Sequence, residues 1–335
     1  MKTKTSKAAI IQESEFKPQR ACLPKPGDSH YFGLYEGPID DTTTREWDFP
    51  TRIATRRRLE RKAWIYLGFF SRDFYMGLAI ADAGYIGKAF SYVYIPSEKF
   101  FMEDKITQPL AFPGDFDATL NNSWRMGRYE ILPSNDRITV NFRGTFDLTA
   151  TFQRKHNGLS TIAPVDNRPF NFTYKEMELL TEGEFIFGSR RQKFSGACGV
   201  LDYTKGYPAR QTHWNWLSMV GKTETGKNLS VNLVDKFNES IENALWLDGR
   251  AMSLSSAHFH FLRPADQSIW RILTRDNIFE TRFRPFGARG ENLNLGVLRS
   301  KFIQPYGIFD GQVQVGDTTE KFTGYGVTED HLALW

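Results

Sequence analysis

The chain has 335 residues, enough for two domains or for one large one. Its 43 basic and 39 acidic residues leave a formal net charge of +4, and so small a basic excess argues against a nucleic-acid-binding protein. Aromatic residues make up 15% of the chain, with 28 Phe and 13 Tyr, which favours strands over helices.

Features that would mark secretion, a membrane span or a zinc site are missing from the sequence. Cys22 and Cys198 are too few for a disulfide scaffold and too isolated for zinc ligation. No uninterrupted apolar stretch approaches the roughly 20 residues of a membrane span, and Ala8–Ile11 is too short for a signal-peptide core. We therefore expect a cytoplasmic protein with no integral membrane segment.

The N-terminal part of the sequence combines a polar arm, a basic cluster and a series of short strands. Residues 1–27 are polar and rich in proline, which predicts an arm laid over the body. The basic cluster from Arg52 to Lys62 is interpreted as a solvated face, with contact to phosphate or anionic lipid as the alternative. Strands are predicted at 63–70, 74–82, 90–95, 124–126, 138–142 and 146–152. A loop is expected from Asn157 to Pro169.

The second half continues in the same rhythm. Strands are predicted at 170–175, 183–188, 211–220, 229–234, 258–262, 270–273, 278–283 and 306–311, with Gly287–Gly290 as a loop. Helical periodicity is missing, and no repeat of 20 to 50 residues is found. The predicted fold is all-β, with two consecutive lipocalin-like antiparallel β-barrels or half-barrels and few helices. After the arm, the expected domains are 28–175 and 176–335.

The segment Asp202–Trp216 holds the most varied chemistry in the sequence. It contains a carboxylate, phenols, cations, an imidazole and two indoles. A turn is expected at 205–208 and a strand from 211 to 220. The residues leave two interpretations open: a core tryptophan pair beside a tight turn, or the wall of a ligand pocket.

Strand alternation separates the side chains of this segment into two sets. Trp214 and Trp216 fall on one face, and His213 and Asn215 fall on the other. We expect the indoles to face the cavity, with Asp202 reaching in from the turn. The candidate catalytic residues are Asp202, Tyr203 and His213, and the candidate ligand-binding residues are Trp64, Arg210, Trp214, Asn215 and Trp216.

These residues would support acid–base chemistry without a cofactor. In a water-excluding barrel the pKa of Asp202 would rise, so that its carboxyl could protonate an alkene or carbonyl. Trp214 or Trp216 would stabilise a developing carbocation. Alternatively, Asp202 pairs with Arg210 or caps its turn.

Two histidine motifs were weighed for metal binding or catalysis. His258 and His260 share a strand face, but no third ligand is identifiable, and no metal is expected. Glu329-Asp330-His331 suggests a catalytic group, but an end-of-chain strand closed by Trp335 is the preferred interpretation.

Asp202–Trp216 and the segments 61–64, 79–85 and 326–335 resemble a bacterial family called domain of unknown function 2804. The resemblance extends from about Cys22 to Trp335 and implies no established activity. More distantly, the order of an Asp-bearing turn, a Trp-x-Trp strand and a glycine hairpin is similar to AttH-like and carotenoid-hydratase-like proteins. That similarity implies a two-domain lipocalin-like (calycin) fold whose members act on oily small molecules without cofactors. Those proteins favour an Asp-His or Asn-rich segment where this chain has Asp202–Gly206.

Two functions follow as expectations. The first is a cofactor-free hydratase, cyclase or isomerase acting on a hydrophobic metabolite, such as an isoprenoid, lipid or polyketide-like molecule. The second is a lipocalin-like carrier or sensor that binds such a molecule unchanged. In both cases the expected partner is a hydrophobic small molecule.

Overall fold

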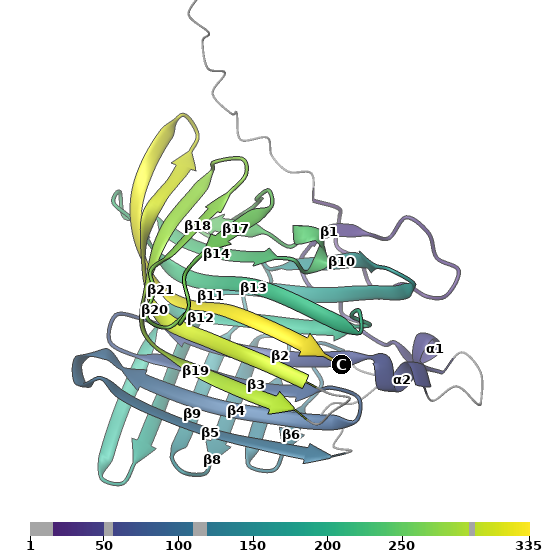
Figure 1. The fold of residues 1–335 in the computed structure, drawn as a ribbon, viewed down its shortest axis with the longest axis horizontal. Coiled ribbons are helices and arrows are strands. Elements are labelled where there is room, and N and C mark those ends of the chain that lie inside the picture. Colours follow the sequence, from purple (N-terminus) through teal and green to yellow (C-terminus); the bar gives the residue numbers. More distant parts are fainter. Residues whose placement is uncertain (1–15, 50–55, 110–118, 295–298) are drawn as a thin grey trace, which may run out of the picture.

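The computed structural model describes residues 16–49, 56–109, 119–294 and 299–335, and in these residues the chain forms two curved antiparallel sheets (Figure 1). Within these described residues, helix is limited to α1 (Arg45–Asp48), α2 (Arg56–Glu60) and two 3-10 turns at Pro96–Glu98 and Asn238–Ser240. This confirms the predicted all-β fold of two lipocalin-like half-barrels.

The first sheet contains the strands that precede residue 207, and its main path runs β5-β4-β3-β2-β12-β11-β9-β8-β7-β6. β10 pairs with β11 and with β1. The strands are β1 (Gly33–Glu36), β2 (Lys62–Phe70), β3 (Tyr75–Asp82), β4 (Ile86–Ile95), β5 (Phe100–Pro109), β6 (Trp124–Met126), β7 (Tyr129–Pro133), β8 (Arg137–Arg143), β9 (Asp147–Gln153), β10 (Leu159–Val165), β11 (Arg168–Phe187) and β12 (Arg190–Gly206).

The second sheet repeats this plan in the order β16-β15-β14-β13-β21-β20-β19-β18-β17. In each sheet an early long strand pairs with the last strand: β2 with β12, and β13 with β21. The strands are β13 (Gln211–Thr223), β14 (Asn228–Asp235), β15 (Ala244–Leu247), β16 (Arg250–Ser253), β17 (Ala257–His260), β18 (Trp270–Thr274), β19 (Phe279–Asn294), β20 (Arg299–Val315) and β21 (Thr318–Leu334).

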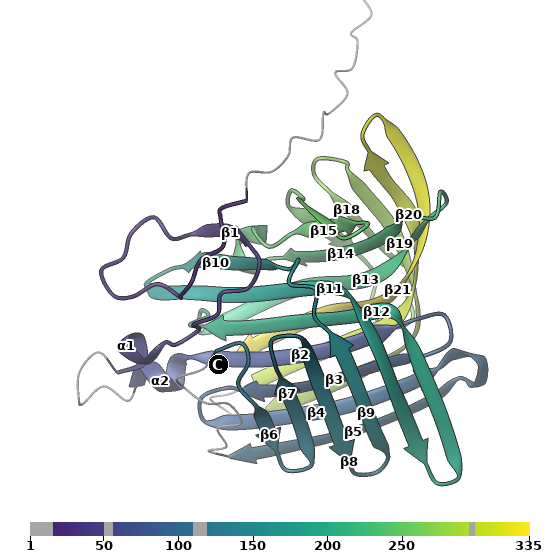
Figure 2. The same ribbon diagram turned by 180° about the vertical axis from the view of Figure 1, so that it is seen from behind.

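Three clusters of buried side chains explain how the sheets are arranged. One cluster consists mainly of side chains from the first sheet, one consists of side chains from the second sheet, and the third lies between the sheets. Strand β9 touches only one cluster and alternates strictly, with Leu148, Ala150 and Phe152 buried. Strand β2 is covered on both faces, so nearly all of its residues are buried. Figure 1 shows β19–β21 crossing β2–β4, and Figure 2 shows the β6–β9 hairpins from behind.

Three predicted loops are strands in the structure. Residues 159–165 form β10 inside the expected 157–169 loop, and Gly287–Gly290 lies within β19. β12 continues to Gly206, so Asp202 belongs to a strand and not to a turn. These segments carry glycine or polar residues that favour turns locally, but the ladder hydrogen bonds of long neighbouring strands prevail.

Three members of the basic cluster before β2 are buried, so the solvated interpretation is wrong for Arg58, Arg61 and Lys62. Arg58 lies 2.7 Å from Asp82, and Arg61 lies 3.3 Å from Asp48 and 3.5 Å from Asp82. Buried charges are stable only when they are paired. The carboxylates of Asp48 and Asp82 therefore stabilise the buried guanidinium groups of Arg58 and Arg61. Arg52 lies outside the described residues.

The change from one sheet to the other falls between Gly206 and Gln211. The expected domain boundary near residue 175 falls inside β11 and stays a prediction. Of the expected arm, residues 1–15 lie outside the described part, whereas Leu23 is buried and its N–H donates to the Asp41 carbonyl at 2.9 Å. Among the described helices, none is long and apolar enough to cross a membrane.

Candidate functional site

A cavity of about 180 Å³ lies between the two sheets, within the third cluster of buried side chains. Side chains from β2–β5, β11 and β12 form one wall, and side chains from β13, β14 and β19–β21 form the other. A buried cavity of about 150 Å³ is known to admit benzene, so this space is large enough for a small organic molecule.

Strand register explains why the first wall gathers both apolar and ionisable groups. Neighbouring strands place one cavity-facing residue each in a single row across the sheet. In order, the row is Lys175, Asp202, Tyr66, Ala79, Phe90 and Lys105. Cross-strand neighbours in such a row lie on the same face of the sheet. The row is therefore charged at both ends and apolar in the middle.

The second wall is built in the same way. Trp214 faces His331 across the β13–β21 ladder, and Trp216 faces Glu329. Beyond His331, the row continues through Phe302 on β20 to Glu291 on β19. All six side chains line the cavity.

Aromatic rings from the two sheets meet across the cavity. Trp64 of β2 and Trp214 of β13 stack with their ring centroids 6.2 Å apart and their planes 8° apart. Trp216 meets Tyr66 edge to face at 5.8 Å. These pairs lie between the sheets and contribute to the largely apolar lining of the cavity.

A buried ionic cluster lies at one end of the first row. Lys175 Nζ donates to Asp202 Oδ1 at 2.5 Å and lies 3.6 Å from Glu242 Oε2. Thr173 Oγ1 donates to the same Glu242 oxygen at 2.5 Å. Two carboxyls thus share one ammonium group beside the Trp216 ring, whose centroid is 5.8 Å from Nζ.

The cluster combines a carboxyl and an amine whose pKa values are both raised. Burial raises the pKa of Glu242 above its usual value, although Lys175 and the Thr173 hydrogen bond oppose the shift. Burial alone would lower the pKa of Lys175, but Asp202 and Glu242 raise it overall. A carboxyl with a raised pKa is protonated over a wider pH range and can act as a general acid.

A second group of interacting polar side chains lies on the wall formed by the second sheet. Trp214 Nε1 donates to Glu329 Oε1 at 2.8 Å, and Gln304 Nε2 donates to Glu329 Oε2 at 3.2 Å. His331 Nδ1 lies 3.5 Å from Glu329 Oε1, and its Nε2 is 2.8 Å from Ser300 Oγ. A carboxylate that orients an imidazole in this way can accept and pass on a proton.

The structure brings four of the predicted site residues together at the cavity: Asp202, Trp64, Trp214 and Trp216. Asp202 pairs with Lys175 on the neighbouring strand, and not with Arg210 as the alternative prediction had it. Arg210 lies in the link between the sheets, where its carbonyl accepts from the Trp335 N–H at 2.9 Å.

Tyr203, His213 and Asn215 point to other parts of the molecule. Tyr203 packs in the core of the first sheet against Trp124, and burial raises its pKa to about 12. His213 Nε2 and Asn215 Nδ2 lie 2.9 and 3.1 Å from Asp330 Oδ1, on the face of β13 opposite the indoles. Strand alternation predicted this separation of the two sets.

Sequence analysis missed the residues that complete the site. Lys175 and Glu242 are 67 positions apart, and each has polar or charged neighbours in the sequence. Nothing in either segment therefore shows that the two residues form a buried pair. Glu329 and His331 were noted, and the structure places them on β21 facing the cavity, with Trp335 also in its wall.

Metal ligation has no clear candidate in the described part of the chain. No group of three or more His, Cys, Asp or Glu side chains is arranged there to hold an ion. The rings of His258 and His260 are 6.5 Å apart on β17, a short strand at the edge of the second sheet. Cys22 and Cys198 are free thiols.

Two curved antiparallel sheets of the same plan, with a largely apolar cavity between them, define an all-β, lipocalin-like protein. The chain belongs to the family described as Domain of unknown function (DUF2804), whose model matches residues 13–335. A search of curated proteins with this sequence finds no match.

Solved structures share the fold at low sequence identity. An AttH-like protein of Nitrosomonas europaea is 15% identical, with a TM-score of 0.54 over 81% of this chain and 92% of that one. Kievitone hydratase of Nectria haematococca is 10% identical, with a TM-score of 0.52 over 88% of this chain and 97% of that one. The structure of CghA with Sch210972 is 9% identical, with a TM-score of 0.48 over 82% and 88%.

Proposed function

We propose that the protein binds a hydrophobic small molecule between its two sheets and acts on it by acid–base chemistry without a cofactor. The observation that carries this proposal is a carboxyl with a raised pKa, Glu242, in the wall of a largely apolar cavity that several aromatic rings line. Pockets that combine an apolar lining with a few convergent ionisable groups are the usual places for binding and catalysis.

The reaction type that suits these groups is hydration, cyclisation or isomerisation of an alkene or carbonyl compound. In this scheme the Lys175–Asp202–Glu242 cluster donates a proton to the ligand. The faces of Trp64, Trp214 and Trp216 stabilise the positive charge that develops. Glu329 and His331, on the other sheet, accept the proton that leaves. The fold is shared with a kievitone hydratase, which agrees with this class of chemistry.

A second function, that of a carrier or sensor, remains a candidate because the aromatic lining alone is sufficient to hold an apolar ligand. Asp202→Asn and Glu242→Gln separate the two functions. In an enzyme either change removes turnover and leaves ligand affinity within a few-fold, because shape is kept and only an ionisable group is lost. In a carrier neither change matters. Turnover is followed as deuterium incorporation from D₂O into geraniol, or as addition of water to it, by mass spectrometry.

Binding itself is tested with naphthalene, a small apolar probe, by ligand-observed NMR. We expect Trp214→Ala to weaken binding by about 1–3 kcal/mol, because an apolar wall of the cavity is lost. His213→Gln, one residue away on the opposite face of β13, is the matched control and should leave affinity unchanged. Equal affinities for wild type and Trp214→Ala would show that the cavity is not the binding site.

A further inference from the structure

Three buried lysines near the sheet interface differ in what surrounds their amines. Lys175 lines the cavity but is paired with Asp202 and Glu242. Lys205 donates to the Thr42 carbonyl at 2.7 Å, on the face of β12 turned away from the cavity. Lys62, the first residue of β2, is 2% exposed and lines the cavity.

The Lys62 amine is held in place without a carboxylate. Its Nζ donates to the Leu59 carbonyl at 2.7 Å and lies 4.9 and 5.8 Å from the ring centroids of Tyr85 and Trp335. Within the described part of the chain, Lys62 forms no ion pair. The surroundings of the Lys62 amine are tightly packed. At Gly84, which has φ +87°, an added Cβ would lie 2.3 Å from the Leu59 carbonyl oxygen.

Burial favours the neutral form of the Lys62 amine. Burial lowers its pKa to about 7, with repulsion from Arg58 and Arg168 acting in the same direction. The carboxylates of Asp82 and Glu60 oppose this shift, but Asp82 is engaged with Arg58 at 2.7 Å and Glu60 with Arg168 at 3.0 Å. At pH 7 about half of such an amine is unprotonated, against roughly one part in 3,000 for an ordinary lysine.

We infer that Lys62 Nζ is a nucleophile that forms an imine with an aldehyde or ketone bound in the cavity. Desolvated lysines in apolar pockets are the type of residue that performs this reaction in proteins. The inference rests on the proposed function, because the cavity must first admit the apolar body of the ligand. It narrows the ligand class to carbonyl compounds.

The step balances without an oxidant or reductant. The lone pair of Nζ forms a bond to the carbonyl carbon, and a proton moves from nitrogen to the carbonyl oxygen to give a carbinolamine. The C–O bond then breaks, and the oxygen leaves as water with the second proton from nitrogen. The product is a C=N bond between Lys62 and the ligand.

The test uses 2-naphthaldehyde, which has the same apolar body as naphthalene and adds only the carbonyl. The purified full-length protein is incubated with the aldehyde at pH 7 and treated with borohydride, which reduces an imine to a stable secondary amine. Peptide mapping by mass spectrometry then locates the modified lysines. We expect Lys62 to be modified on the order of tenfold or more over any other lysine, and excess naphthalene to protect it.

Two internal controls are present in the same sample. Lys205 shares with Lys62 its burial and a pKa that burial lowers to about 7, but it does not face the cavity. Lys175 faces the cavity but is ion-paired. Both should stay unmodified. Lys62→Met should abolish the selective modification.

The outcomes separate this inference from the proposed function. If naphthalene binds but Lys62 is modified no faster than exposed lysines, the imine is refuted and the binding site stands. Modification of Lys62 that naphthalene does not prevent also refutes the inference, because the amine would then react from outside the cavity. Failure of naphthalene to bind refutes the proposed function itself.

Discussion

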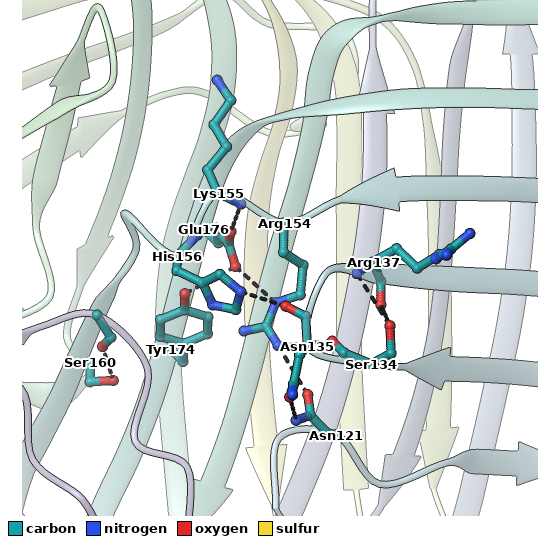
Figure 3. Close-up of polar contacts among 11 residues, drawn as sticks. Asn121, Ser134, Asn135, Arg137, Arg154, Lys155, His156, Ser160, Tyr174 and Glu176 are labelled. Carbon is teal, nitrogen blue, oxygen red and sulfur yellow. Dashed lines mark hydrogen bonds and ion pairs between the residues drawn. The ribbon is translucent and has the colours of Figure 1, made fainter.

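Lys175 and Glu176 are neighbours on β11, and both are buried, yet their surroundings are opposite in kind. Glu176 faces the core of the first sheet, where Arg154, Tyr174 and the backbone N–H groups of Lys155 and His156 all donate to its carboxylate (Figure 3). Lys175 faces the cavity, where one ammonium serves two carboxyls. Glu176, whose carboxylate accepts from four donors, supports the fold. Lys175 shares its ammonium between two carboxyls beside the cavity, and the proposed proton transfer depends on this arrangement.

The largest effect on stability is expected from Glu176→Ala. We expect the free energy of unfolding to fall by about 3–5 kcal/mol, because Arg154 is left buried without its carboxylate. Urea unfolding measures the loss. Glu130→Gln, which removes an exposed partner of Arg125, is the control and should change stability by less than about 1 kcal/mol. A loss of that small size for Glu176→Ala would remove the structural role assigned to it.

A second buried lysine on the cavity side, Lys62, should make the stability of the protein depend on pH. The folded pKa of about 7 lies below the usual 10.5, so the folded protein binds fewer protons than the unfolded chain in this range. The stability of the wild type should therefore rise as the pH increases from 7 toward 10.5.

Lys62→Met should be the more stable protein at pH 7, by at least about 1 kcal/mol, and its advantage should shrink as the pH rises. Urea midpoints measured at several pH values for both proteins give the difference. Parallel pH profiles would show that Lys62 keeps an ordinary pKa in the folded protein.

Glu242→Gln tests the proton held in the cavity cluster. A carboxyl whose folded pKa is raised contributes most stability below its usual value of 4.5, and that contribution is lost as the pH rises through the folded value. The variant lacks this loss, so its stability relative to wild type should increase from pH 4.5 toward neutrality. A constant difference over that range would mean that Glu242 does not hold the proton.

The smallest effect is expected at His213, which extends the comparison to the two faces of β13. Its contact with Asp330 is partly exposed and shared with Arg263, so His213→Gln should change stability by less than about 1 kcal/mol. Thermal unfolding measures it. A large loss of ligand affinity or of turnover would return His213 to the catalytic site.

Features that depend on neighbouring residues could be predicted from the sequence, whereas contacts between distant segments could not. Alternation in 146–152 predicted the half-buried strand β9, and the aromatic run at 63–70 predicted the strand β2. In both cases the local pattern of residues was sufficient. Trp214 and Trp216 were correctly separated from His213 by the same argument.

What sequence could not supply was the pairing between distant strands. Asp202 meets Lys175 only because β11 and β12 are in one register, and Glu242 arrives from a loop beyond β14. Gly287–Gly290 looked like a loop until β20 supplied the partner for a long β19. Arg58 and Arg61 looked solvated because nothing in their own segment shows the carboxylates that cover them.

The stacked pair of Trp64 and Trp214 has a practical consequence for folding studies. The two indoles come from different sheets and lie nearly parallel, so their electronic transitions can couple only when both halves of the molecule have docked. An exciton couplet in the far-ultraviolet circular dichroism spectrum would thus report assembly of the halves separately from strand formation within each. The protein therefore carries its own optical probe of docking between the halves, and Trp64→Phe would remove the signal.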